Sequence, residues 1–291
     1  MLKKTTYKLD KFKKICIIYG SFQKNLYKLL YKWEVFVMGI KKGKRICDIL
    51  IATLMLISVY YFINSIYIEK QNREIQAIEK EQTEVMNKVE NDKKVATQIS
   101  TKNDYNKTKT NSLKDLDYYK NYYSNNDIVG TLKISGTKIN TLLVQGSDNE
   151  YYLNHTISKK KSSVGSIYVD YRTNLDAKQI NIYGHNSKAV KLMFNELEKY
   201  RSKDFYESHK TIELYDGTKT SIYEIFSVQI VSNDYEHYDV DADDWIKHID
   251  TLNNSIYTTN TKATPEDEIL IIQTCLYNPV NSLLLINAKK V

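Results

Sequence analysis

From about residue 119 onward, the chain consists of short alternating or apolar runs separated by Gly, Asn and Asp turns. Alternation of this kind predicts β-strands, because successive side chains on a strand point to opposite faces. The segment "YDGTKT" between two of the runs predicts a hairpin turn. The runs are "IVGTLKI", "INTLLVQ", "GSIYVDY", "QINIYGH", "TIELYD", "SIYEIFSVQIV", "EILIIQTC" and "SLLLINA". Together they predict a mostly β barrel or sandwich.

Two helical patterns interrupt these runs. The segment "SKAVKLMFNELEKY" predicts a helix over 187–200, with its apolar face made by Val190, Met193, Phe194 and Leu197. The segment "DADDWIKHIDTLNNSI" begins with acidic residues, which favour a helix N-terminus. In this second helix the expected apolar side consists of Trp245, Ile246 and Ile249.

A much longer apolar run, "ICDILIATLMLISVYYFINSIYI", covers 46–68 with a single charge, Asp48. This length predicts a transmembrane helix. Basic residues stand directly before the run and tyrosines near its far end, so the positive-inside rule predicts a single-pass anchor with a cytoplasmic N-terminus and an extracellular remainder. A cleaved signal peptide and a buried core helix are the alternatives.

The positive charge of the chain is concentrated in residues 1–45, where 13 Lys or Arg stand against two acidic residues, a net of +11. With a total of +7, the rest of the chain carries a net of −4. This distribution argues against a nucleic-acid-binding protein. We expect 1–45 to be a basic cytoplasmic segment. Met38, which begins "MGIKKGKRICDIL", is an alternative translation start.

Residues 69–118 are polar, and their first half has helix-favouring composition with loose helical spacing of apolar residues. We therefore expect a stalk or linker that continues the membrane helix. The domain order is then the basic segment, the anchor at 46–68, the stalk at 69–118 and a globular domain at 119–291.

The chain has three cysteines, Cys16, Cys47 and Cys275, whose odd number and irregular spacing predict neither a disulfide framework nor a zinc site. Only Cys275 lies in the globular domain, where the apolar run "IIQTC" gives way to a polar turn. A thiol titrates near ~8.5, so a catalytic cysteine needs a base or cation beside it. His185 follows "INIYG" at a strand exit, the placement that a rigid scaffold gives to catalytic groups.

The other histidines are weaker candidates for that partner. His209 and His248 have the sequence context of ordinary surface residues, and His237 lies in the acidic segment "DYEHYD". His155 follows an aromatic cluster in "YYLNHTI". The residues alone therefore favour His185 and leave the others open.

Residues 119–291 resemble the sortases, the membrane-anchored cysteine transpeptidases of Gram-positive surfaces, and among them class B. The resemblance rests on "VQGSDNEYYLNH", "GSIYVDYR", "NIYGHN" and "IIQTC" in this order and spacing, and on a helical insertion before the last of them. It implies an eight-stranded sortase-type β-barrel with a few helices, preceded by the transmembrane helix and stalk. It also implies that His185 and Cys275 are catalytic.

The resemblance further implies the reaction. Cys275 would cleave the C-terminal sorting signal of a surface protein at its threonine through a thioacyl intermediate. The protein would then pass to an amine of a peptidoglycan precursor or a pilin, without a metal or organic cofactor. The membrane lipid is the remaining expected partner, through the N-terminal helix, and nucleic acid is not one.

The sequence departs from the sortase pattern where a third catalytic residue, an arginine on the last strand, is expected. That strand reads "NSLLLINAKKV", and the matching position is Ser282 or Leu283. We expect Thr274 to line the substrate groove, and Asn281 and Ser282, with Asn278, to offer replacement hydrogen bonds. A sortase-like module that binds sorting signals without efficient turnover, and a purely structural envelope protein, are the alternatives.

Overall fold

The computed structural model describes residues 43–100, 108–187, 190–233 and 242–291. It divides into two compact units, Met1–Tyr67 and Ile68–Val291. The expected basic segment before residue 43, the alternative start at Met38 and His237 lie outside the described residues.

The predicted membrane segment is helical. It lies in helix α2, Gly43–Ser100, which is the one helix in the described chain that is long and apolar enough to cross a membrane. The most apolar window of this helix has a mean hydropathy of 2.0, and none of it is buried. Large side chains such as Leu56 and Tyr60 are 70% and 66% exposed. This exposure argues against the buried core helix that the sequence left open.

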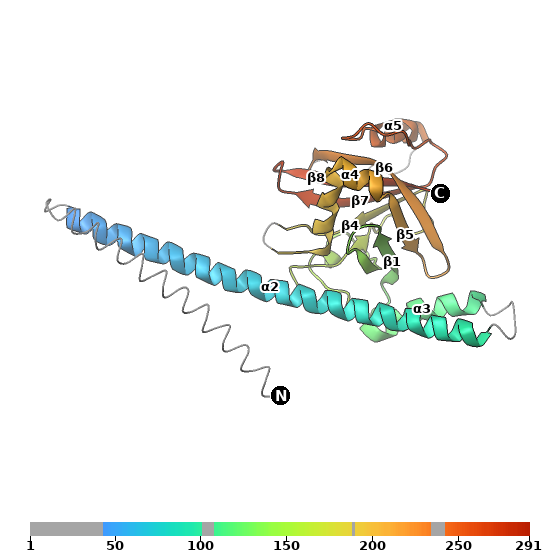
Figure 1. Ribbon diagram of the computed structural model, residues 1–291, viewed down its shortest axis with the longest axis horizontal. Helices are drawn as coiled ribbons and strands as arrows, with labels where there is room; N and C mark the ends of the chain where they lie inside the picture. Colours follow the sequence, from blue (N-terminus) through green and yellow to red (C-terminus); the bar gives the residue numbers. More distant parts are fainter. Residues whose placement is uncertain (1–42, 101–107, 188–189, 234–241) are drawn as a thin grey trace. The chain divides into compact units, whose positions relative to one another are not determined.

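The second unit contains a closed eight-stranded barrel, which confirms the predicted fold (Figure 1). Around the barrel the strands follow the order β1-β2-β3-β4-β7-β8-β6-β5. Each predicted run contains one strand. The strands are β1 Ile128–Ile134, β2 Asn140–Val144, β3 Tyr168–Val169, β4 Gln179–Tyr183, β5 Thr211–Tyr215, β6 Thr220–Ser232, β7 Ile269–Leu276 and β8 Ser282–Lys290.

The strand pairing has two features that matter for the site. β4 and β7, far apart in sequence, are parallel neighbours, whereas β7 and β8 form an antiparallel pair. The β5–β6 pair is the predicted hairpin, and its turn is closed by a hydrogen bond from Asp216 N–H to Lys219 O at 3.2 Å. Gly217 supplies the left-handed backbone of that turn, with φ of +92°.

Alternation along the strands separates two apolar layers. The largest cluster has members from all eight strands and therefore fills the barrel interior, with Ile182, Ile272 and Leu284 among them. A second cluster lies on the outer face of β7 and β8, where Trp245 and Ile249 of α5, Ala242–Leu252, pack. Ile246 is 59% exposed, so its predicted place on the apolar side of that helix is wrong.

The other predicted helix starts later than expected. It is a 3₁₀-helix, η2, Met193–Arg201, instead of a helix from residue 187. The Asn195 side chain accepts the Leu192 N–H at 2.8 Å and donates to Ser187 O at 2.6 Å. These bonds fix Ser187 and Leu192, which both lie outside the helix. The helix leads into the short α4, Lys203–Ser208.

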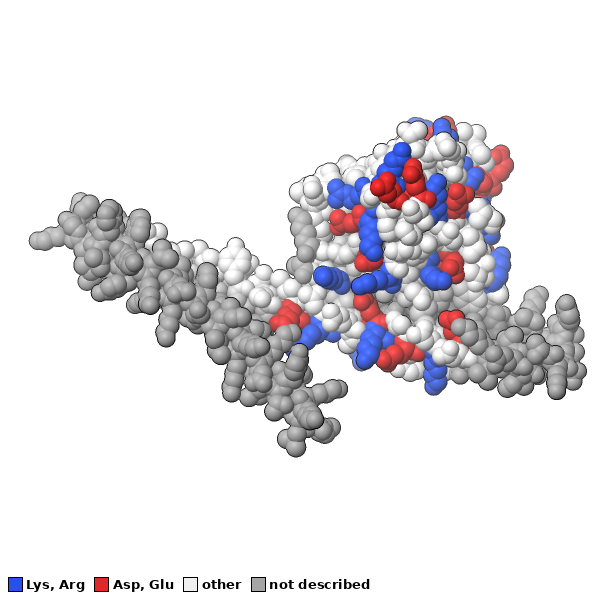
Figure 2. All heavy atoms as spheres, in the orientation of Figure 1, with Lys and Arg blue, Asp and Glu red and all other residues white. Residues whose placement is uncertain are grey.

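The part of α2 that belongs to the second unit packs against the barrel. Val85 and Val89 of α2 share an apolar cluster with residues of α3, Thr108–Tyr123, and with Leu142 and Val144 of β2. Of the predicted stalk, residues 69–100 and 108–118 are helical, and side chains of both parts pack in this unit. On the face drawn in Figure 2, basic and acidic side chains are interspersed over the barrel, so this face lacks the single-sign field typical of a nucleic-acid footprint.

Candidate active site

The candidate site lies where β4 and β7 end side by side. Their parallel register pairs Tyr183 with Gln273, and the Thr274 hydroxyl donates to Gly184 O at 2.8 Å. His185 lies two residues after Tyr183, just beyond the end of β4, and Cys275 lies two residues after Gln273, within β7. Paired residues of neighbouring strands project their side chains to the same face. The imidazole and the sulfur therefore emerge at the same end and on the same face of the barrel.

Cys275 is exposed and free. Its neighbour Thr274 is 2% exposed, so alternation along β7 turns the hydroxyl inward and the sulfur outward. Partial burial around the sulfur raises the pKa of the Cys275 thiol. The thiol therefore needs a positive partner to become a thiolate at neutral pH.

The His185 ring is oriented by a backbone carbonyl. Its Nε2 lies 2.9 Å from Leu153 O, at the end of the short 3₁₀-helix η1, Tyr151–Leu153. A carbonyl oxygen only accepts, so this contact assigns the proton to Nε2 and leaves Nδ1 for the sulfur or the substrate. Across the described residues no hydrogen bond joins the His185 ring to the Cys275 sulfur.

Asn186 links the two halves of the site, and the sequence reasoning missed it. Its side-chain Nδ2 donates to Cys275 O at 2.9 Å and to Glu198 Oε1 at 2.7 Å. Tyr277 OH in turn donates to Asn186 O at 3.1 Å. The residue after the histidine is thereby bound to Cys275 itself and to Tyr277, just beyond the end of β7. Its place directly after His185 is the only signal in the sequence.

Leucine lies directly across from the cysteine on the strand where an arginine was expected. β8 places Leu283 directly opposite Cys275, and Ser282 opposite Leu276. Directly opposed residues share a face, so Leu283 and not Ser282 stands beside the sulfur. Leu283 is 6% exposed and belongs to the apolar cluster of Trp245.

The other expected polar residues have local partners. The Ser282 hydroxyl donates to Pro279 O at 2.7 Å. Asn281 is exposed, with a left-handed backbone at φ of +57°, and its carbonyl accepts the Asn233 N–H at 3.1 Å. Thr274, through its bond to Gly184 O, fixes the strand ends. These contacts favour a positioning role for Thr274 and Ser282.

Arg172 is paired with a buried carboxylate. Its Nε and Nη2 donate to Asp170 at 3.0 and 2.7 Å, and Tyr183 OH donates to the same carboxylate at 2.8 Å. Burial alone would raise the pKa of Asp170, but these hydrogen bonds and the charge of Arg172 lower it to about 2. Asp170 stays ionised and keeps the arginine paired.

Tyr168 of β3 is a second residue that sequence reasoning missed. It is 4% exposed, and its ring lies 5.5 Å from that of Tyr183 between centroids. Burial, and after it the charges of Asp170 and Cys275, raise the pKa of Tyr168. Its hydroxyl therefore keeps its proton at neutral pH and remains a hydrogen-bond donor.

The other described histidines have structural contacts. His248, expected at the surface, is instead 4% exposed, with Nε2 2.7 Å from Gln179 Oε1, because α5 covers the outer face of β7. His155 stacks on Tyr151 with ring centroids 4.0 Å apart. His209 stacks on Phe205 at 4.3 Å.

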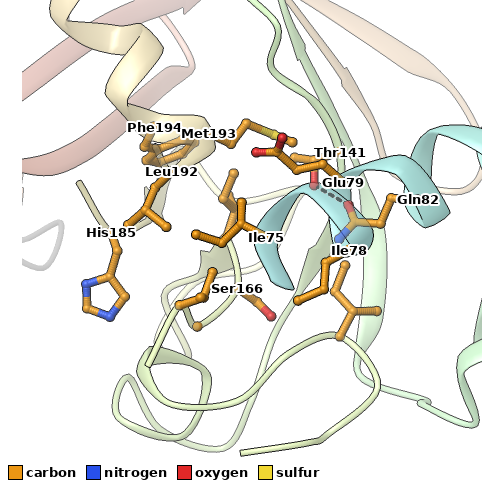
Figure 3. Close-up of a pocket in the computed structure, with 14 residues that line it drawn as sticks. Ile75, Ile78, Glu79, Gln82, Thr141, Ser166, His185, Leu192, Met193 and Phe194 are labelled. Carbon is orange, nitrogen blue, oxygen red and sulfur yellow. Dashed lines mark hydrogen bonds between the residues drawn. The ribbon is translucent and has the colours of Figure 1, made fainter. Parts of the chain in front are cut away.

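A pocket borders the candidate site. It is an open pocket between α2 and the barrel, with His185 at one end and Gln82 at the other (Figure 3). Most of its lining is apolar, including Ile75, Ile78 and Leu192. Cys275 is not among the lining residues, so the pocket touches the histidine side of the site only.

Comparison with known proteins gives one family. No family model matches the chain. Sortase B of Listeria monocytogenes is 38% identical over 160 residues, which cover 52% of this chain and 63% of that protein. Sortase B of Staphylococcus aureus is 33% identical over 158 residues, 52% of this chain and 64% of that protein. The match therefore spans less than two thirds of the length of these relatives.

Solved structures extend this likeness to the fold. The crystal structure of Clostridium perfringens sortase B is 31% identical, with a TM-score of 0.55, and the match covers 60% of this chain and 98% of that one. A Staphylococcus aureus sortase B–substrate complex, at 27% identity, has a TM-score of 0.54 over 61% of this chain and 85% of that one. Sortase B complexed with triglycine, at 28% identity, has a TM-score of 0.53 over 60% and 86%.

Proposed function

Because the chain belongs to the class B sortase family, we propose that it is an active cysteine transpeptidase that cleaves a C-terminal sorting signal at threonine and transfers the protein to an amine. The observation that carries the proposal is the parallel register of β4 and β7, which brings His185 and Cys275 to one end of the barrel. Solved complexes of sortase B with substrate and with triglycine support a peptide signal and an amine acceptor.

In the first half of the reaction, the Cys275 thiolate attacks the threonine carbonyl beside a protonated His185. Desolvation opposes the thiolate, and a neighbouring imidazolium offsets this effect. Collapse of the tetrahedral intermediate gives a thioacyl enzyme. His185 delivers its proton to the leaving amine.

In the second half, a neutral His185 accepts a proton from the incoming amine of a peptidoglycan precursor or a pilin. The amine then attacks the thioacyl carbon and releases Cys275. The Leu153 carbonyl keeps the same imidazole edge oriented through both halves, because Nε2–H persists in the neutral and the charged ring.

The oxyanion needs donors other than a β8 arginine. We propose the hydroxyl of Tyr168 together with backbone N–H groups near Cys275. A neutral hydroxyl stabilises an oxyanion less than the charged fork of an arginine does. We therefore expect turnover below that of a sortase with the arginine.

The apolar part of α2 is proposed to anchor the enzyme in the membrane, with the N-terminus in the cytoplasm. Its length and hydropathy suit a span, and Lys41, Lys42, Lys44 and Arg45 precede it. The catalytic domain then lies outside the cell, where surface proteins and the wall are accessible. Protease added to intact cells should remove the domain; protection of the domain would contradict this orientation.

A second candidate is a module that binds sorting signals without efficient turnover, favoured by Leu283 at the arginine position. One assay separates the two. The full chain in detergent is incubated with fluorogenic peptides carrying NPxTN-like and NPxTG-like motifs, with and without triglycine. Cleavage that the Cys275→Ala variant lacks supports the enzyme. Saturable binding of the same peptides by both proteins, without cleavage, supports the module.

A further inference from the structure

The stalk part of α2 contacts the polypeptide on both sides of His185. Gln71 Nε2 donates to Ser163 Oγ at 2.7 Å, and Ser162 Oγ donates to Glu74 Oε1 at 3.3 Å. Asn72 Oδ1 accepts the backbone N–H of Lys191 at 3.1 Å. These bonds join segments 88 to 119 residues apart along the chain.

The first contact leads to the carbonyl that orients the histidine. Ser162 N–H donates to Asn154 O at 2.8 Å, and Ser166 N–H donates to Tyr152 O at 2.9 Å. Between them Gly165 has a φ of +63°, and a Cβ there would come within 2.7 Å of Leu153 O. The segment that α2 holds is therefore packed directly on the Leu153 carbonyl that receives His185 Nε2–H.

The second contact leads to the chain that follows the histidine. Lys191, which α2 holds through its N–H, precedes Leu192, whose N–H is bound by the Asn195 side chain. Asn195 also donates to Ser187 O, two residues after His185. This route reaches His185 through its own backbone.

Directly after these contact residues, α2 forms one wall of the pocket. Ile75 is 3% exposed and, with Ile78, lines the pocket that has His185 at its edge (Figure 3). Packing of this kind fixes the helix against the barrel, so the hydrogen bonds at Gln71, Asn72 and Glu74 act from a rigid element.

We propose that residues 71–75 of α2 hold His185 in the orientation that it needs to act on Cys275, so that the stalk supports the active site. The inference rests on the proposed function, because the orientation of the imidazole matters only if His185 acts on the sulfur. Small misplacements of a general base lower turnover far more than they lower substrate binding.

The test uses the full chain with Asn72→Leu, which removes the acceptor for Lys191 N–H at similar volume, and with the double variant Gln71→Leu/Glu74→Leu. We expect kcat for the sorting peptide to fall about 5–20-fold in each, with KM nearly unchanged. The rate at which iodoacetamide alkylates Cys275 at neutral pH should fall too, because that rate follows the thiolate that His185 stabilises. Asn72→Asp, which keeps an acceptor oxygen, should restore both.

Arg73→Ala is the matched control, since its side chain is 62% exposed on the same helix, and it should change neither rate. Unchanged kcat and alkylation in folded Asn72→Leu would overturn the proposal, as would a lowered melting temperature with full activity of the folded fraction. If the wild-type chain cleaves no peptide, the proposed function fails, while the alkylation rates still decide whether α2 positions His185.

Discussion

The two strands that flank β7 give Cys275 opposite surroundings. On the β4 side the sulfur has an imidazole oriented by a carbonyl, and Asn186 ties that side to Cys275 O. On the β8 side it has Leu283, an apolar residue packed under α5. The β4 side retains the groups for proton transfer, whereas the β8 side lacks the charged donor expected for the oxyanion. Under the proposed mechanism, the missing arginine therefore affects the oxyanion and not the proposed nucleophile and base.

The largest effect on activity is expected from replacing His185, on the β4 side of Cys275. His185→Gln should lower kcat/KM for the sorting peptide by about 10²–10⁴-fold, because it removes the general acid and base. His155→Gln, at a ring that stacks on Tyr151 and has Nδ1 2.8 Å from Tyr151 O, is the matched control and should stay within twofold. Stopped assays of peptide cleavage measure both. Equal activities of the two variants would remove His185 from the mechanism.

Introducing an arginine on the β8 side of Cys275 should have the next largest effect, and this effect should be a gain in activity. Leu283→Arg places a charged fork beside Cys275 and should raise kcat by about 10–10²-fold, given the usual contribution of an oxyanion donor. Leu283→Lys should gain less, because it lacks the planar fork. Leu283→Met controls for disturbance of the α5 cluster. A folded Leu283→Arg without any gain would mean that the site already has an equivalent donor.

Removing the proposed substitute donor should have a smaller effect. Tyr168→Phe should lower kcat about tenfold, less than loss of a charged donor, and leave KM unchanged. In the Leu283→Arg background the same substitution should cost little, because the arginine takes over the contact. A double-mutant cycle on kcat measures this coupling. Additive effects would show that Tyr168 acts elsewhere.

The smallest effect on activity is expected at the ion pair beside the site. Asp170→Asn should lower the free energy of unfolding by about 1–3 kcal/mol at pH 7, since it leaves Arg172 without its buried partner. The pKa of Asp170 is lowered to about 2, so its contribution is present at neutral pH and is lost as pH falls from about 4 towards 2. Urea unfolding measures this effect: the free energies of unfolding of the variant and the wild type should differ at pH 7 and converge at pH 2. Asp117→Asn, at an exposed position, should match wild type at both.

The sequence predicted the barrel well because its strands are short, alternating and separated by turn residues. Each run corresponds to one strand, and even the Asp216–Lys219 turn was marked. The motif resemblance selected His185 and Cys275 as catalytic, and that assignment stays a prediction. The choice between Ser282 and Leu283 was not readable, because a shift of one residue moves a side chain to the other face and only the β7–β8 register decides it.

Other features depended on contacts that no local pattern contains. His248 and Ile246 lie on one helix, and which of them is buried depends on how α5 rotates onto β7. The bonds of Asn72 and Gln71 to residues about a hundred positions away are equally invisible in a polar stalk sequence. Tyr168 lies in "GSIYVDYR" and Asn186 in "NIYGHN". Their proposed roles depend on neighbouring residues from other strands, which these motifs do not show.

The parallel pairing of β4 with β7 also affects how the protein folds. Strands that are joined by such a long crossover pair slowly, because loop closure must precede any gain from the contact. The base and the nucleophile therefore meet only when the sheet closes, and a half-assembled chain carries a thiol of ordinary reactivity. Under the proposed mechanism, the Cys275 thiol gains its reactivity only once the barrel is complete.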